Sequence, residues 1–195
     1  MQSTPEIIII GAGPAGLTLS LLLARNNIKS LVLEKSLQAT DDTRAVFYNA
    51  ESQFESERAG ILDQVKQRGF HINAASFRDL SGKRLFAMPG AGQISLIQKE
   101  LTAIIQEAVE EDKLTEILWG HEVVELGQDE ESAWVDVQTA NAKSRLSAKY
   151  IVGCDGGSST VRRMLFGKDA MKGFTWEKPL VTIDVSRFAA VNDLV

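Results

Sequence analysis

The chain has 195 residues, 24% of them charged, and a formal net charge of −5 at pH 7. This length allows one well-packed core and part of a second. The acidic balance excludes the basic footprint of a protein that binds nucleic acid or an anionic membrane surface, so small molecules or other proteins are the expected partners. A single cysteine, Cys154, excludes an intrachain disulfide and favours a reducing compartment.

The start of the sequence predicts a cytoplasmic protein. A β-branched run begins at Ile7, and no basic segment with a signal-type apolar stretch precedes it. No run of apolar residues approaches the ~18 to 20 that a membrane span requires. We therefore expect no membrane partner.

A glycine-rich turn follows the first predicted strand, residues 7–10, and an apolar segment after it predicts a helix that ends at Asn26-Asn27. The spacing of the turn is G-x-G-x-x-G, which is typical of a pyrophosphate site at a helix start. Its residues are Gly11, Ala12, Gly13, Pro14, Ala15 and Gly16.

Each glycine of this motif has a distinct physical role. Gly11 permits the tight turn, Gly13 lets the backbone approach the phosphates, and Gly16 lets the helix pack closely on the strand. Pro14 fits because the first N–H groups of a helix have no partner within the helix. The motif therefore predicts a dinucleotide site.

An acid ends the second predicted strand, residues 30–33, where Glu34 is followed by Lys35. In this kind of unit such an acid holds a ribose hydroxyl, and its charge repels a 2′-phosphate. We therefore expect FAD or NAD rather than NADP at this site. The alternative is a structural glycine turn with a solvated Glu34, which the order of strand, turn, helix, strand and acid disfavours.

Residues 36–43 are polar and predict a loop, which Arg44 follows. Arg44 is a candidate for contact with a cofactor phosphate or ring, and a solvated surface arginine is an equally good interpretation. Helices are predicted over about 51–58 and from Ile61 to Gly69.

Short strands are expected between residues 70 and 88, with a hairpin whose turn is Ser81-Gly82. Ser95 and Gln98 have the spacing of a capping box, which predicts the start of a helix. Apolar residues then recur on one helical face: Leu101, Ile104, Ile105, Ala108 and Val109. The acidic residues at the end of that helix, which are Glu107, Glu110, Glu111 and Asp112, are expected to form a solvated face.

Three further strands are predicted over residues 115–126, 132–140 and 144–152. Alternating apolar and polar positions in the second strand indicate an antiparallel meander inserted into an α/β frame. The predicted fold class is therefore α/β, with a Rossmann-like domain that carries this meander.

The third of these strands leads into Asp155-Gly156, and Ser158 or Ser159 is expected to cap a short helix that ends at Gly167. As in the first motif, an acid and glycines lie at the predicted start of a helix. This segment is a second candidate for an edge that faces a nucleotide.

Three motifs together carry a resemblance to a known family. They are Gly11–Gly16 with Glu34, Thr43-Arg44-Ala45, and the segment from Cys154-Asp155-Gly156 to Val161-Arg162-Arg163. Over about residues 5–185 the chain resembles the FAD-dependent aromatic monooxygenases of the para-hydroxybenzoate hydroxylase type. In that family the first motif holds the ADP half of FAD, the acid matching Glu34 binds its ribose, and the arginine matching Arg44 lies near the flavin.

The resemblance also implies roles for Asp155 and Gln98. The family's Asp-Gly motif is associated with both FAD and NAD(P)H, whereas the structural alternative for Asp155 is a carboxylate that organises a helix start. Gln98 falls where many members place a flavin-contacting residue, and the capping box explains it equally well. The expected cofactor-binding residues are Gly11, Ala12, Gly13, Pro14, Ala15, Gly16, Glu34, Lys35, Arg44, Gln98 and Asp155.

Members of the family are longer and carry a third motif, Gly-Asp, which has no counterpart after Asp155. The sequence is therefore interpreted as a truncated member. Residues 1–167 are the FAD-binding domain, 70–92 contribute strands on the substrate side, and 168–195 begin the substrate-domain β-sheet. An exposed apolar surface and an unpaired edge at Leu180–Val185 predict a homo-oligomer or a protein partner.

The resemblance implies an FAD-dependent monooxygenase that hydroxylates an aromatic or enolic small molecule with NADH or NADPH and O₂. The redox chemistry belongs to the cofactor, so no catalytic residue is named and no metal is expected. His71 and His121 are expected to be ordinary histidines, and Cys154 a small buried residue. The alternatives are a non-redox dinucleotide-fold module, as a binding partner or in a non-oxidative step, and an NAD-dependent dehydrogenase.

Overall fold

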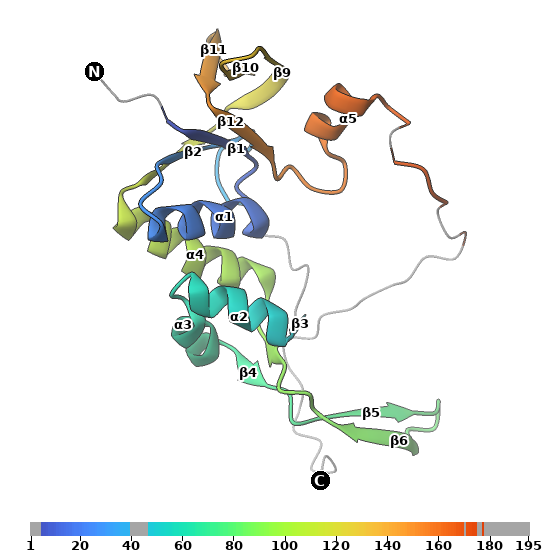
Figure 1. Ribbon diagram of the computed structural model, residues 1–195. Coiled ribbons are helices and arrows are strands. Elements are labelled where there is room, and N and C mark those ends of the chain that lie inside the picture. Colours follow the sequence, from blue (N-terminus) through green and yellow to red (C-terminus); the bar gives the residue numbers. More distant parts are fainter. Residues whose placement is uncertain (1–4, 40–46, 170, 175–176, 178–195) are drawn as a thin grey trace.

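A parallel sheet lies between a helical layer and an antiparallel meander in the computed structural model, which describes residues 5–39, 47–169, 171–174 and 177 (Figure 1). The sheet is four-stranded, in the order β12-β1-β2-β8, and each adjacent pair is parallel. Its strands are β1 (Ile7–Ile10), β2 (Ser30–Glu34), β8 (Thr115–Trp119) and β12 (Tyr150–Gly153). The predicted α/β class is confirmed.

Both faces of the sheet are buried, which explains why β1 consists of four isoleucines. Ile9 and Val32 face α1 (Pro14–Arg25) and α4 (Gln98–Asp112), where they join the larger apolar core. Ile8 and Ile10 point the other way, into a second core beneath the meander. Successive side chains of a strand alternate between faces, so one strand anchors both layers.

The inserted meander is confirmed, although its strand boundaries differ from the prediction. It consists of β9 (Glu122–Gln128), β10 (Ala133–Gln138) and β11 (Lys143–Ala148), in the order β11-β10-β9. The single strand predicted over 115–126 is wrong, because the chain turns at Gly120, where φ is +69°. Its first half is β8 of the parallel sheet and its second half is β9 of the meander.

The strand predicted over 144–152 is wrong in the same way. β11 ends at Ala148 and β12 begins at Tyr150, so a single residue, Lys149, separates strands of two different sheets. The N–H of Lys149 donates to the Glu6 carbonyl at 3.1 Å, and its ammonium pairs with the Glu6 carboxylate at 3.1 Å. Apolar alternation continues through both breaks, which is why the sequence pattern hides them.

The predicted helices are present as α2 (Ala50–Arg58), α3 (Leu62–Arg68) and α5 (Thr160–Phe166). Three two-residue strands form a small antiparallel sheet next to α2 and α3, in the order β3-β7-β4. These strands are β3 (Phe47–Tyr48), β7 (Ile94–Ser95) and β4 (Phe70–His71).

The start of α4 corrects the predicted capping box. The helix begins at Gln98, its N-cap position is Ile97, and no side chain caps it. Ser95 lies instead in β7, where it pairs with Phe47 and Phe70. The helix itself and its buried apolar face are confirmed, because Leu101, Ile104, Ile105 and Val109 are buried and Ala108 packs against them.

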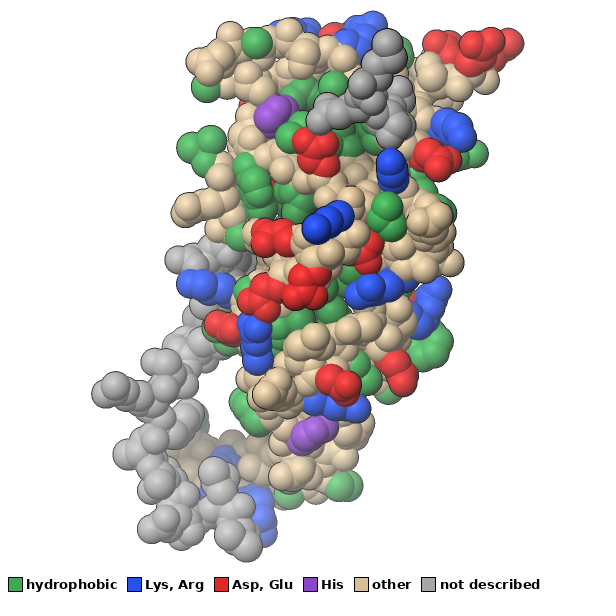
Figure 2. Space-filling view, turned by 90° about the vertical axis from the view of Figure 1, so that its left-hand side faces the viewer, with side chains coloured by type: hydrophobic (Ala, Val, Ile, Leu, Met, Phe, Trp, Pro, Cys, Tyr) green, Lys and Arg blue, Asp and Glu red, His purple; other side chains and the backbone are tan. Residues whose placement is uncertain are grey.

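The acidic end of α4 is only partly a solvated face, contrary to the prediction. The side chain of Asp112 is 11% exposed and pairs with Arg25 at 3.0 Å. Glu107 pairs with Arg68 at 2.6 Å. These bridges tie α4 to α1 and α3, so two of the acids act as links between helices. Figure 2 shows acidic and basic side chains interspersed on one face of the molecule.

The predicted hairpin is confirmed as β5 (Ala74–Arg78) and β6 (Arg84–Pro89), which extend away from the helices (Figure 1). Asp79 closes the turn by accepting hydrogen bonds from the N–H groups of Ser81 and Lys83, and Gly82 has φ +87°. All residues of both strands are exposed. The domain boundary at residue 167 stays a prediction, since Leu180–Val185 lies outside the described residues.

Candidate functional site

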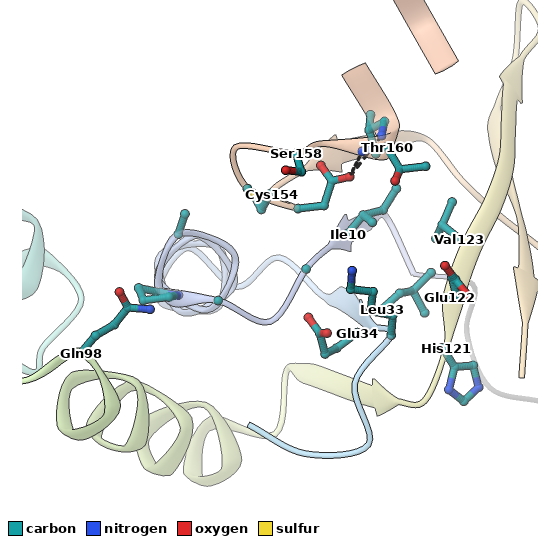
Figure 3. Close-up of a pocket in the computed structure, with 18 residues that line it drawn as sticks. Ile10, Leu33, Glu34, Gln98, His121, Glu122, Val123, Cys154, Ser158 and Thr160 are labelled. Atoms are coloured by element: carbon teal, nitrogen blue, oxygen red, sulfur yellow. Dashed lines mark hydrogen bonds between the residues drawn. The ribbon is translucent and has the colours of Figure 1, made fainter. Parts of the chain in front are cut away.

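A cavity of about 360 Å³ opens where β1, β2 and β12 end (Figure 3). Open α/β sheets bind their ligands at this carboxyl edge. Of the residues predicted to bind a cofactor, those that line the cavity are Gly11, Gly13, Pro14, Ala15, Glu34, Lys35, Gln98 and Asp155. Two of the others do not line it, since Ala12 is a buried residue of the turn and Gly16 packs against the Gly11 backbone. Arg44 lies outside the described residues.

The first and last glycines of the motif are required by the protein's own packing. Gly11 has φ +108°, and a Cβ there would lie 2.6 Å from the Cys154 carbonyl oxygen. A Cβ at Gly16 would collide with the Gly11 carbonyl oxygen. The turn is further fixed by the Gly11 N–H, which donates to the Leu33 carbonyl at 2.8 Å. Both glycines therefore hold the strand, the turn and the helix close together.

Gly13 is different, because no described residue requires a glycine there. Its φ is −75°, which any residue can adopt, and a Cβ would meet no described atom within 4 Å. The residue lines the cavity at the N-terminus of α1, where no side chain caps the helix. The open space fits a pyrophosphate that approaches the backbone and accepts hydrogen bonds from the first N–H groups of the helix.

The carboxylate of Glu34 is held beside this open space by two backbone groups. Its Oε2 accepts a hydrogen bond from the Ala12 N–H and its Oε1 one from the Ser36 N–H, each at 2.9 Å. A carboxylate oxygen has two lone pairs, so both oxygens can still accept from the hydroxyls of a ribose. Glu34 is therefore a positioned acid, and the alternative of a freely solvated one is wrong.

The turn between β8 and β9 also holds the backbone from Glu34 to Ser36. The N–H of Gly120 donates to the Ser36 carbonyl and the N–H of His121 to the Glu34 carbonyl, both at 2.8 Å. The meander thereby fixes the backbone that carries the acid. The positive φ of Gly120 is what allows the chain to turn at this point.

Asp155 organises the start of α5, which confirms the structural interpretation of this residue. Its Oδ1 accepts from the Ser159 hydroxyl at 2.6 Å, and its Oδ2 accepts from the N–H groups of Thr160 and Val161 at 2.6 and 3.1 Å. Burial opposes ionisation, but these hydrogen bonds hold the pKa of the Asp155 carboxyl below its ordinary value. Ser159 caps the helix, as predicted, by accepting from the Arg162 N–H.

Asp155 also lines the cavity, so the structural role leaves room for a contact with a cofactor. Its neighbour Cys154 is half-buried at the same edge. Burial and the adjacent Asp155 charge raise the pKa of the Cys154 thiol, which keeps it protonated and a poor nucleophile. Cys154 is therefore part of the wall of the cavity.

Gln98 lines the cavity from the first turn of α4, on the side of α1 in Figure 3. Because no capping box forms, the capping explanation for this residue fails. Its amide offers both a donor and an acceptor to a ligand. A cofactor contact by Gln98 stays a prediction.

The β8–β9 turn brings to the cavity three residues that sequence reasoning missed: His121, Glu122 and Val123. They follow Gly120, and an isolated glycine within a strand pattern is a signal of a break or a close backbone approach. His121 was expected to be an ordinary histidine. Its Nδ1 lies 2.7 Å from the Trp119 carbonyl oxygen, so this nitrogen carries the hydrogen and donates it.

Two further observations concern metal ions and membrane spans. Within the described part of the chain, no group of three or more His, Cys, Asp or Glu side chains is placed to hold a metal ion. None of the helices in the described ranges has the length and apolar character needed to cross a membrane.

Comparison with known proteins gives the family. The profile of the family described as FAD binding domain matches residues 4–193. Para-nitrophenol 4-monooxygenase of Pseudomonas sp. (strain WBC-3) is 27% identical to this chain over 194 residues, which cover 95% of this chain and 48% of that protein. A 3-(3-hydroxy-phenyl)propionate/3-hydroxycinnamic acid hydroxylase of Comamonas testosteroni is 31% identical over 192 residues, covering 94% and 32%.

Among solved structures, p-nitrophenol 4-monooxygenase PnpA from Pseudomonas putida DLL-E4 superposes with a TM-score of 0.80 at 26% identity. The match covers 85% of this chain and 44% of that one. The chain thus spans about a third to a half of the length of these relatives. The open space over Gly13 and the acid beside it fit FAD, and the chain belongs to the FAD binding domain family.

Proposed function

We propose that the protein is an FAD-dependent monooxygenase that uses NADH or NADPH and O₂ to hydroxylate an aromatic small molecule. The names of the relatives support this proposal, since p-nitrophenol 4-monooxygenase and the 3-(3-hydroxy-phenyl)propionate hydroxylase act on phenolic compounds. An enolic substrate would serve the same chemistry, because it is also electron-rich. The free Cys154 is consistent with a cytoplasmic location, which is part of the proposal.

The observation that carries the proposal is the placement of Gly13 and Glu34 on one cavity wall. The backbone at Gly13 and the start of α1 would bind the pyrophosphate of FAD, and the Glu34 carboxylate would bind the hydroxyls of its ribose. The same carboxylate would repel a 2′-phosphate. This favours FAD over NADP at this edge.

The chemistry of the reaction would come from the bound flavin. When bound, FAD accepts two electrons from NAD(P)H and delivers one atom of O₂ to a substrate C–H bond, giving C–OH, while the other atom leaves as water. The residues of this chain bind and orient. Gln98, Lys35 and Asp155 line the cavity, and none of the described residues is assigned a proton transfer.

The experiment is to record the visible absorption and fluorescence of the purified chain with added FAD, and then to add NADH or NADPH without oxygen. We expect the flavin fluorescence to change on binding and the flavin absorbance to bleach with one of the two nicotinamides. FAD binding without bleaching would overturn the redox part of the proposal and favour a non-redox module. Absence of FAD binding would overturn the site itself.

A further inference from the structure

The β8–β9 turn places a second acid, Glu122, on the cavity wall beyond Glu34. The N–H of His121 donates to the Glu34 carbonyl at 2.8 Å, so the next residue, Glu122, lies beside the end of β2. Figure 3 shows Glu122 and Val123 on β9, on the same side of Glu34 as Leu33. Glu122 has no role in the proposed function.

The order of the strands places the base of a dinucleotide at this turn. A pyrophosphate at Gly13 lies at the end of β1, and a ribose at Glu34 lies at the end of β2. The next strand in the sheet is β8, which leads into the turn before Glu122. The base follows the ribose in the nucleotide, so it continues in the same direction, toward β8 and β9. This step rests on the proposed function.

The wall at that place has the composition of a site for a flat, partly polar ring. Leu33 and Val123 are 1% and 7% exposed and belong to one packed apolar cluster. Both residues line the cavity, and this packing holds the small part of each that reaches it rigid. Glu122 is exposed beside them, and no side-chain hydrogen bond or ion pair joins it to another described residue. Glu34, in contrast, already accepts two backbone hydrogen bonds.

We propose that Glu122 reads the base of the cofactor by accepting a hydrogen bond from the 6-amino group of adenine. An ionised carboxylate is an acceptor only, so it suits an amino group and opposes a carbonyl oxygen at the same ring position. A base with a 6-oxo group would place two acceptors against each other at that position. Glu122 is thus a specificity-determining residue for an adenine nucleotide.

The test compares FAD with its deaminated analogue, in which the base is hypoxanthine and an oxygen replaces the 6-amino group. Binding of each to the full chain is measured by flavin fluorescence at one pH and one salt concentration. We expect the wild type to prefer FAD by about tenfold, the low end for a hydrogen bond to a charged group at an exposed site. Glu122→Ala should weaken FAD binding by about tenfold and should not weaken binding of the analogue, because it also removes the acceptor that opposes the 6-oxo oxygen.

Glu122→Gln sharpens the test, because an amide can accept from an amino group or donate to a carbonyl oxygen. Its preference for FAD over the analogue should fall below about threefold, while FAD itself still binds. Glu116→Ala is the matched control. Glu116 is an exposed acid of β8 outside the cavity wall, so its removal changes the net charge equally and should leave both affinities unchanged.

Each other outcome overturns a stated claim. Equal affinity of the wild type for FAD and the analogue overturns the role of Glu122 and leaves the proposed function intact. Tighter binding of both ligands to Glu122→Ala means that the acid only repels the phosphates, which also overturns it. If the wild type binds neither ligand, the proposed FAD site fails as well.

Discussion

The carboxyl edge of the parallel sheet and the β5–β6 hairpin are opposites in how their apolar side chains are covered. At the edge, Ile10 and Leu33 are buried, and backbone hydrogen bonds fix the turn, the acid and the β8–β9 turn around a cavity. In the hairpin every strand residue is exposed, and Phe77 and Phe86 are 60% and 54% exposed. Their rings stack on each other at a centroid distance of 6.3 Å.

The two regions differ in whether described residues of this chain cover their apolar side chains. The edge is held by residues from β1, β2, β8 and β12, which surround the cavity. A two-stranded hairpin has little stability of its own in water, and exposed apolar groups indicate a surface that another surface covers. Substitutions in each region should therefore have different readouts: ligand affinity at the edge, and association at the hairpin.

The largest effect is expected for Gly13→Val. Its Cβ meets no described atom within 4 Å, so the chain should fold normally, while the side chain fills the path of the pyrophosphate. We expect FAD affinity to fall by more than about a hundredfold. Thermal unfolding followed by circular dichroism, together with flavin fluorescence, measures the two quantities separately.

Gly11→Val is the contrasting control. Its Cβ would lie 2.6 Å from the Cys154 carbonyl oxygen, and its φ of +108° is strained for valine. Overpacking and backbone strain together should lower the free energy of unfolding by roughly 2 to 4 kcal/mol. If Gly13→Val unfolds the chain instead, or binds FAD as the wild type does, the distinction between the two glycines is wrong.

A smaller effect is expected for Glu34→Ala. The substitution removes the acceptor for the ribose and also the partner of the Ala12 and Ser36 N–H groups. A hydrogen bond to a charged group contributes roughly 1.5 to 3 kcal/mol, so FAD affinity should fall about ten- to a hundredfold. Titration calorimetry with FAD measures this loss, with Glu116→Ala as control. A change of less than twofold would show that Glu34 serves only the protein's own backbone.

At the start of α5 the expected effect is on stability and depends on pH. Asp155→Ala removes the acceptor for Ser159, Thr160 and Val161 and should lower the free energy of unfolding by about 1 to 2 kcal/mol at pH 7. The folded pKa of Asp155 is below its unfolded value of about 3.9. Its contribution is therefore present above the unfolded pKa and lost as pH falls through the folded one.

Urea unfolding of the wild type and Asp155→Ala at a series of pH values checks this sign. The difference between the two proteins should be largest at neutral pH and should shrink below about pH 4. Glu130→Ala, at an exposed turn acid without a described hydrogen bond, should change little at any pH. A difference that grows toward acid pH would contradict the lowered pKa.

The sequence predicted the parts of the site that depend on local spacing. The strand, the turn, the first helix and the acid at Glu34 follow from residues close together in the chain, and the structure confirms each of them. The Ser159 cap and the end of α5 at Gly167 were predictable for the same reason. Local rules suffice where the pattern lies within one strand–turn–helix–strand unit.

Prediction failed where distant segments decide the structure. Nothing in the alternation of residues 115–126 shows that Thr115–Trp119 pairs with β2 and Glu122–Gln128 with β10, since both halves are β-rich. His121 and Glu122 reach the cavity only because the turn at Gly120 bonds to Glu34 and Ser36. Ser95 had the spacing of a cap, but pairing with Phe47 and Phe70 placed it in a strand.

The smallest effect on folding is expected at the hairpin, and it bears on the prediction that the chain self-associates or binds a protein partner. Phe77→Ser with Phe86→Ser changes two exposed side chains, so the free energy of unfolding should change by no more than about 0.5 kcal/mol per site. If the hairpin is the surface that associates, the same change should lower the mass measured by light scattering at micromolar concentration.

Phe54→Ser, at a side chain 58% exposed on α2, should leave that mass unchanged. A monomeric wild type would contradict self-association, and an equal loss of mass in both variants would place the contact outside the hairpin.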